Sequence, residues 1–98
     1  MNIDELILEF QELIEEFMYK NLTKWKCSNV NIQVFKVRNG KKIIFTCQAI
    51  DEKGKVIIEW SRAYRVQNVN VKELVKKCLG IAKELERIYN VKIQVLRN

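Results

Sequence analysis

The stretch NVNIQVFKVRNGKKIIFTCQAID, residues 29–51, contains two runs of alternating apolar and polar side chains on either side of Asn39-Gly40. Alternation with a period of two is typical of a strand with one buried face, and Asn-Gly between two such runs predicts a tight β-hairpin. A two-residue turn there pairs Val34 with Phe45 and Ile32 with Cys47, so the apolar faces of the two strands coincide. We expect the rest of the fold to be built around this hairpin.

The strands of the hairpin are expected over Asn29–Arg38 and Lys41–Asp51, and a third alternating run covers Lys55–Gln67. The turn before the third strand, Glu52-Lys53-Gly54, is compatible with two registers. A two-residue loop at Lys53-Gly54 faces Trp60 with Cys47 and Ile58 with Ala49. A three-residue loop with Gly54 in the left-handed conformation instead moves Glu59 and Ser61 onto the core side. We prefer the first register because it buries more carbon.

In the preferred register, the third strand turns one apolar set toward the core: Val56, Ile58, Trp60, Tyr64 and Val66. Arg62 is the charged member of this set. It indicates either a position at the edge of the helix layer or an error in the register. The opposite face of the three strands is mixed, and it carries Asn31, Gln33, Phe35, Lys42, Ile44, Thr46, Gln48, Glu59, Ser61 and Arg65. Such a face can be solvated, bind a ligand or form a dimer interface.

Two amphipathic helices flank the strands. The first begins at an Asn2/Glu5 capping box, and its apolar positions recur with a helical period: Ile3, Leu6, Ile7, Phe10, Leu13, Ile14 and Phe17. Residues 20–29 are expected to form a loop. The second helix begins near Asn70, with Glu73 completing another capping box, and ends near Asn90. Its apolar stripe contains Val71, Leu74, Val75, Cys78, Ala82, Leu85 and Ile88, and Gly80 lies within the helix. A last strand is expected over Val91–Leu96.

The resulting order is α-β-β-β-α-β within a single domain, residues 1–98. We predict an α+β two-layer sandwich: an antiparallel three-stranded meander plus a C-terminal strand, with two helices on one face. The order resembles the first half of a ribonuclease H-like fold, but the strand carboxylates of that family have no counterpart on Val30–Val37 or Val91–Leu96. The first five elements also resemble a double-stranded-RNA-binding domain. Here Lys72 stands alone at the helix start, and Asn39-Gly40 replaces that family's His-containing loop.

The residue types argue against catalysis, metal binding and cofactors. The chain has no His, its three Cys form no CxxC pair, and Gly40, Gly54 and Gly80 are isolated. Cys47 and Cys78 fall on apolar faces and are expected in the core, whereas Cys27 lies among lysines as a free thiol. The first residues contain no basic and apolar signal, and no apolar run is long enough to span a membrane. We therefore expect a non-enzymatic, cytoplasmic protein with no cofactor, no metal and no membrane association.

The distribution of charge is the most informative feature for function. The chain has 98 residues and a net charge of +6, but residues 1–19 contain six acidic residues and no Lys or Arg. The remainder therefore carries +12. Its basic residues form three groups, each of which is a candidate nucleic-acid contact. They are Lys24 and Lys26 around Trp25, with Lys20; Lys36, Arg38, Lys41 and Lys42 at the first hairpin; and Lys72, Lys76, Lys77, Lys83 and Arg87 on the second helix. Arg65, on the mixed sheet face, is a further candidate.

Two hypotheses for function remain open. In the first, the protein binds nucleic acid without sequence specificity and with a preference for single strands; cations hold phosphates while Trp25 or Phe35 stacks on a base. In the second, it is a protein-interaction module, either a homodimer or a small viral or mobile-element inhibitor of a host protein. Its interface is then the mixed sheet face with Phe35 and Ile44, or the acidic first helix. Basic groups that converge on Trp25 favour the first hypothesis, and scattered ones favour the second.

Overall fold

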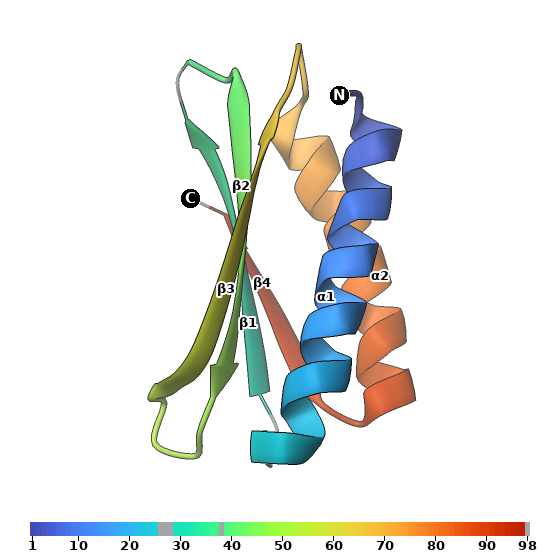
Figure 1. The fold of residues 1–98 in the computed structure, drawn as a ribbon. Helices are drawn as coiled ribbons and strands as arrows, with labels where there is room; N and C mark the ends of the chain where they lie inside the picture. Colours follow the sequence, from blue (N-terminus) through green and yellow to red (C-terminus); the bar gives the residue numbers. More distant parts are fainter. Residues whose placement is uncertain (26–28, 38, 98) are drawn as a thin grey trace.

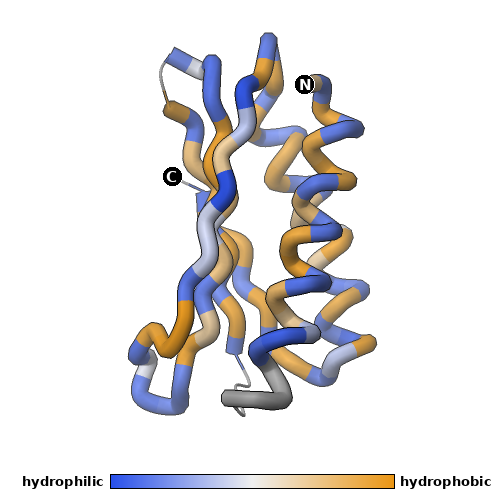
Figure 2. Tube along the Cα trace, in the orientation of Figure 1, coloured by the Kyte–Doolittle hydropathy of each residue, from blue (hydrophilic) through white to orange (hydrophobic). Residues whose placement is uncertain are grey.

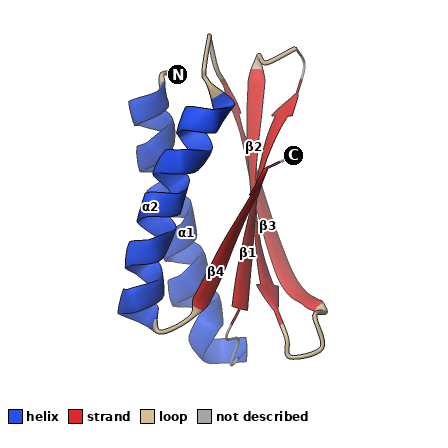
Figure 3. Ribbon diagram, turned by 180° about the vertical axis from the view of Figure 1, so that it is seen from behind, coloured by secondary structure: helices blue, strands red, loops and turns tan. Residues whose placement is uncertain are grey.

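A computed structural model describes residues 1–25, 29–37 and 39–97, with the side chains of residues 22–25 outside the description. The elements are α1 (Ile3–Trp25), β1 (Asn29–Val37), β2 (Lys42–Ile50), β3 (Val56–Arg65), α2 (Val71–Tyr89) and β4 (Lys92–Arg97). They form the predicted two-layer α+β sandwich, with both helices on one face of a single sheet (Figure 1). The strand order is β3-β2-β1-β4, and β4 lies parallel to β1. Seen from behind, the edge strand β4 lies nearest the viewer, and a short loop connects it to the end of α2 (Figure 3).

The first hairpin has the predicted register. Val34 pairs with Phe45 and Ile32 with Cys47. Asn39 and Gly40 both have positive φ, 55° and 82°, as a two-residue type I′ turn requires. The twist of this turn matches the twist of the two strands, so the sequence signal and the observed geometry have the same physical cause.

The second turn combines the two alternatives that the sequence left open. Gly54 has a φ of 80°, and the Asp51 N–H donates to the Lys55 carbonyl over 2.9 Å, so the loop contains three residues. Nevertheless, Cys47 pairs with Trp60 and Ala49 with Ile58, as in the preferred register. The register shifts by one residue between Ala49 and Ile50, which pairs with Val56. A β-bulge at Ile57 therefore absorbs the additional loop residue.

The helix termini follow the predicted caps. The Asn2 side chain accepts a hydrogen bond from the Glu5 N–H over 2.9 Å, and the Asn70 side chain accepts one from the Glu73 N–H over 3.3 Å. Asn90 ends α2 in the left-handed conformation, with a φ of 53°. The loop predicted for residues 20–29 is wrong over residues 20–25, because α1 continues to Trp25. No Gly or Pro interrupts this segment, and the buried Asn21 amide donates to the Phe17 carbonyl over 2.8 Å instead of competing with the helix.

The core lies between the sheet and the helix pair. Figure 2 shows that hydrophobic residues recur along the helices and along the strands. The inward residues of β1 and β2 are fully buried: Val30, Ile32, Val34, Ile43, Phe45, Cys47 and Ala49. The predicted core is wrong at two positions. Val56 is 40% exposed because the bulge at Ile57 ends the alternation before it reaches the turn. Ile88 is 64% exposed because it lies on the flank of the α2 stripe, while Tyr89 packs against the core in its place.

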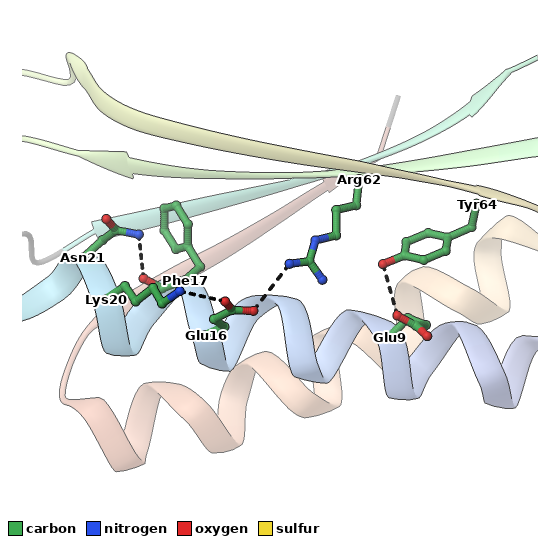
Figure 4. A network of polar contacts seen from close by, with 7 residues as sticks. All are labelled: Glu9, Glu16, Phe17, Lys20, Asn21, Arg62 and Tyr64. Atoms are coloured by element: carbon green, nitrogen blue, oxygen red, sulfur yellow. Dashed lines mark hydrogen bonds and ion pairs between the residues drawn. The ribbon is translucent and has the colours of Figure 1, made fainter.

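Polar contacts join the edge strand β3 to α1 (Figure 4). Arg62 donates to the Glu16 carboxylate over 3.4 Å, and Tyr64 donates to Glu9 over 3.3 Å. Lys20 bonds the same Glu16 carboxylate over 3.0 Å; this bond and the two cations lower the Glu16 pKa. Burial, followed by the neighbouring Glu9 charge, raises the pKa of Tyr64. Arg62 therefore lies at the edge of the helix layer. This is the first of the two explanations that the sequence allowed for a charged residue in this apolar set, the other being an error in the register.

Candidate nucleic-acid interface

The sheet face opposite the helices is built of cross-strand rows. Because paired residues share a face, the register aligns the predicted mixed set across the strands. From the first hairpin downward, the rows are Arg65–Lys42–Val37, Ala63–Ile44–Phe35, Ser61–Thr46–Gln33–Leu96 and Glu59–Gln48–Asn31–Gln94. We call this surface the open face. It changes along the strands from basic, through apolar and hydroxyl-bearing, to an amide-rich row that also contains the acidic Glu59.

The basic row places two like charges side by side. Lys42 on β2 is the Cα partner of Arg65 on β3. Like charges directly opposite each other in a sheet are destabilising. Within the described ranges, no carboxylate forms a salt bridge with Lys41, Lys42 or Arg65. An anion bound at this row would remove the repulsion.

A cavity of about 700 Å³ lies beside the basic row, at the end of the sheet. Three cationic residues, Lys41, Lys42 and Arg65, line it together with Met1, Val66 and Gln67. None of these lining residues is acidic. The Val66 N–H donates to the Lys41 carbonyl over 3.0 Å, which holds the end of β3 against the first hairpin and thus fixes the spacing of the cations.

The next row gives the cations an apolar neighbour. Phe35 pairs with Ile44, and both side chains are partly exposed on the open face. Beyond them, the Thr46 and Ser61 hydroxyls are hydrogen-bonded to each other over 2.9 Å, and the Gln48 amide donates to Glu59 over 3.1 Å. An aromatic ring one row from two unpaired cations can stack on a base while the cations hold its phosphate.

The structure brings together only part of the predicted site. Lys41 and Lys42 are near the first turn with Arg65. Lys36 is near the same turn with its side chain over Gly40, but it pairs with the buried Ile43 and therefore lies on the helix side of the sheet, not on the open face. Arg38 and Lys26 lie outside the described residues, as do the side chains of Lys24 and Trp25. The helix that carries residues 24 and 25 ends at the opposite end of the molecule from the first turn (Figure 1). The first-hairpin group therefore does not converge with the segment around Trp25, so the convergence that would favour a nucleic-acid site centred on Trp25 is absent, and a nucleic-acid interface has to rest on the open face alone.

The third group lies on the other layer. Lys72, Lys76, Lys83 and Arg87 are exposed on the outer surface of α2, and Arg87 is paired with Glu84 over 3.1 Å. The helix layer covers the opposite face of the sheet, so this stripe and the open face are separate surfaces. The Lys42–Arg65 pair was not predicted from the sequence, although the preferred register implies it. Gln94 was not predicted either, because the sequence does not place β4 in the sheet.

Other chemistry finds little support in the described part of the chain. No group of three His, Cys, Asp or Glu side chains there could hold a metal ion. Cys47 and Cys78 are buried, as predicted, and burial raises the pKa of each thiol to about 12; Cys27 lies outside the described residues. None of the helices, as far as they are described, has the length and apolar character needed to cross a membrane. No protein-family model, curated protein or solved structure matches this chain.

Proposed function

We propose that this protein binds nucleic acid without sequence specificity, through the basic and apolar rows of the open face. The observation that supports this most directly is the Lys42–Arg65 pair, two like charges that face each other beside a cavity with no acidic lining residue. A phosphate between them converts a repulsive pair into two charge-assisted hydrogen bonds. Lys41 lines the same cavity and provides a third cation.

Single strands fit the open face better than duplexes. Phe35 and Ile44 form a small apolar platform next to the cations, and an unpaired base exposes the ring face that such a platform needs. A duplex keeps its base faces stacked internally, so it offers this surface its backbone and groove edges but no ring face for stacking. The amide row beyond the platform, with Asn31 and Gln48, can donate to base edges without requiring one sequence.

The test is a fluorescence-anisotropy titration of a labelled single strand and of its duplex, each at two salt concentrations. We expect tighter binding of the single strand and a slope of log K against log salt of about −1.4, because the phosphate shared by Lys42 and Arg65 and the phosphate at Lys41 contribute about −0.7 each. The variant K42A/R65A should lower the affinity and reduce the magnitude of the slope by about 0.7. Phe35→Ala should cost about 1–3 kcal/mol while leaving the slope unchanged.

The matched control is K76A/K83A, which removes the same charge from the outer surface of α2. We expect this variant to bind almost as the wild type does. If it loses as much affinity as K42A/R65A, the site is the α2 stripe and the open-face proposal is wrong. Binding that does not respond to salt, or the absence of binding to any oligonucleotide, would also contradict the proposal.

A further inference from the structure

β3 forms one edge of the sheet, and no other described strand pairs with its outer side. This strand is the outer member of the order β3-β2-β1-β4 and contains ten residues. In an antiparallel pair, alternate residues direct both backbone groups toward the partner strand. The Val66 N–H donates to the Lys41 carbonyl, so the backbone groups of Val66 point toward β2. By alternation, the backbone groups of the other even-numbered residues, back to Ile58 after the bulge, also point toward β2. The N–H and C=O groups of Glu59, Ser61, Ala63 and Arg65 therefore point outward. The Arg65 carbonyl already accepts a hydrogen bond from the Met1 amino group over 3.4 Å, so pairing of this residue with a second copy would have to replace or share that bond.

The outward residues are electrostatically self-complementary. Glu59 lies near one end of this segment and Arg65 at the other, with the small residues Ser61 and Ala63 between them. If two copies of β3 pair antiparallel about a two-fold axis at Arg62, each Glu59 lies opposite an Arg65, and each Ser61 lies opposite an Ala63. These are residues with outward backbone groups, so the register also satisfies the hydrogen bonding of the edge.

The other edge lacks this complementarity. β4 contains six residues, and its charged members, Lys92 and Arg97, are both basic. An antiparallel pairing of two β4 strands therefore brings no acid opposite a base, and the full-length register brings Lys92 opposite Arg97. Natural edge strands are commonly protected by such positive charges.

We propose that the chain forms a symmetric dimer by antiparallel pairing of β3 with β3 of a second copy, which produces a continuous eight-stranded sheet. Two Glu59–Arg65 ion pairs fix the register from the open face. Because a guanidinium has five N–H donors, each Arg65 can bond Glu59 of the second copy and still donate to a phosphate beside Lys42. On the helix side, Trp60 faces Tyr64 of the partner, and aromatic cross-strand pairs are favourable. The two Arg62 side chains meet at the axis, where each already has the Glu16 carboxylate of its own α1 at 3.4 Å.

The test is the mass of the protein in solution, measured by light scattering after size-exclusion chromatography over a range of concentrations. We expect the wild type to have the mass of two chains. Glu59→Arg and Arg65→Glu each place like charges opposite each other, so either variant should have the mass of one chain. The double variant E59R/R65E exchanges the charges and should recover the mass of two chains. Circular dichroism checks that each variant is folded.

The matched control is Glu12→Arg, the same charge change at an exposed position on α1, which should keep the mass of two chains. A wild type with the mass of one chain at every concentration overturns the proposal. So does a dimeric Glu59→Arg, or a folded double variant that stays monomeric. The double variant also separates this inference from the proposed function. It leaves Glu beside Lys42, so it should dimerise while losing affinity for oligonucleotides.

Discussion

Gly40, in the first turn, and Gly80, in α2, differ in whether their positions need a residue without a side chain. Gly40 has a φ of 82°, a conformation that costs a side-chain-bearing residue about 1–2 kcal/mol. A Cβ there would lie 2.5 Å from Cε of Lys36, which would have to move. Gly80 lies in the middle of α2, where a Cβ would meet no other part of the protein within 4 Å, so it does not serve a close packing contact. The turn therefore needs its glycine, whereas the helix does not.

Substitution of each glycine by alanine should shift stability in opposite directions. Gly40→Ala is expected to lower the free energy of unfolding by about 1–2 kcal/mol, since it places a Cβ in the left-handed region. Gly80→Ala should raise it by about 1 kcal/mol, because alanine favours the helix. Urea denaturation followed by circular dichroism measures both. A loss of stability in Gly80→Ala would contradict the open space around this position.

At the scale of elements, the β2–β3 connection combines a three-residue loop held by the Asp51 side chain with a strand register that a two-residue loop would give. The Asp51 carboxylate accepts hydrogen bonds from the backbone N–H groups of Lys53 and Lys55 over 2.9 and 2.8 Å. These bonds hold a three-residue loop, as is typical of an Asp at the start of a turn. The bulge at Ile57 then returns Ile58 and Trp60 to the register that buries them.

Removal of the Asp51 carboxylate should loosen this connection. Asp51→Ala leaves two backbone N–H groups to water and should lower the free energy of unfolding by about 1 kcal/mol. Asp51→Asn keeps the accepting oxygen and serves as the control, with an effect well below that of the alanine variant. Equal losses in the two variants would show that the charge, and not the turn geometry, contributes the stability.

The sequence predicted those elements whose signals are local. The Asn39-Gly40 turn, the caps at Asn2 and Asn70, and the helical period of Leu6 to Phe17 depend on neighbouring residues alone. The end of α1 was not predicted, because Asn21 looks like a helix-ending residue unless its bond to the Phe17 carbonyl is known. The bulge was also not predicted, because each loop length at the second turn was assumed to determine one register of β3. At the candidate site, the Lys42–Arg65 pair follows from the predicted register, but the cavity depends on tertiary placement of Met1 and Gln67.

At the scale of the whole molecule, charge is distributed unevenly over both layers. The acidic residues of α1 and the basic outer surface of α2 share the helix layer, while the open face carries Glu59 at one end and, at the other, Lys42 and Arg65, which form no salt bridge with any described carboxylate. Between the layers lie two thiols, Cys47 on β2 and Cys78 on α2, both fully buried. Cys47 also contributes to the raised pKa of Cys78, which reflects their proximity across the layer interface.

The reactivity of these two thiols should measure how often the sheet and the helix layer separate. In a Cys27→Ser background, we expect neither Cys47 nor Cys78 to react with a disulfide reagent at neutral pH, because burial raises both pKa values to about 12 and excludes the reagent. Both should react fully in denaturant. Because the folded state itself is unreactive, labelling under native conditions should occur only through global unfolding, slowly and at one common rate for both thiols. A faster rate for one thiol would contradict a single cooperative core.

The parallel pairing of β1 with β4 has a consequence for how this protein is synthesised. β1 is an inner strand, and one of its neighbours, β4, is contributed by residues 92–97. A nascent chain that has emerged from the ribosome through α2 therefore has β1 exposed as a sheet edge, beside a helix whose β4 contacts are still missing. Pairing between residues so distant in sequence also slows folding. The interval before β4 emerges is thus the time at which the chain is most exposed to mispairing with its neighbours on a polysome.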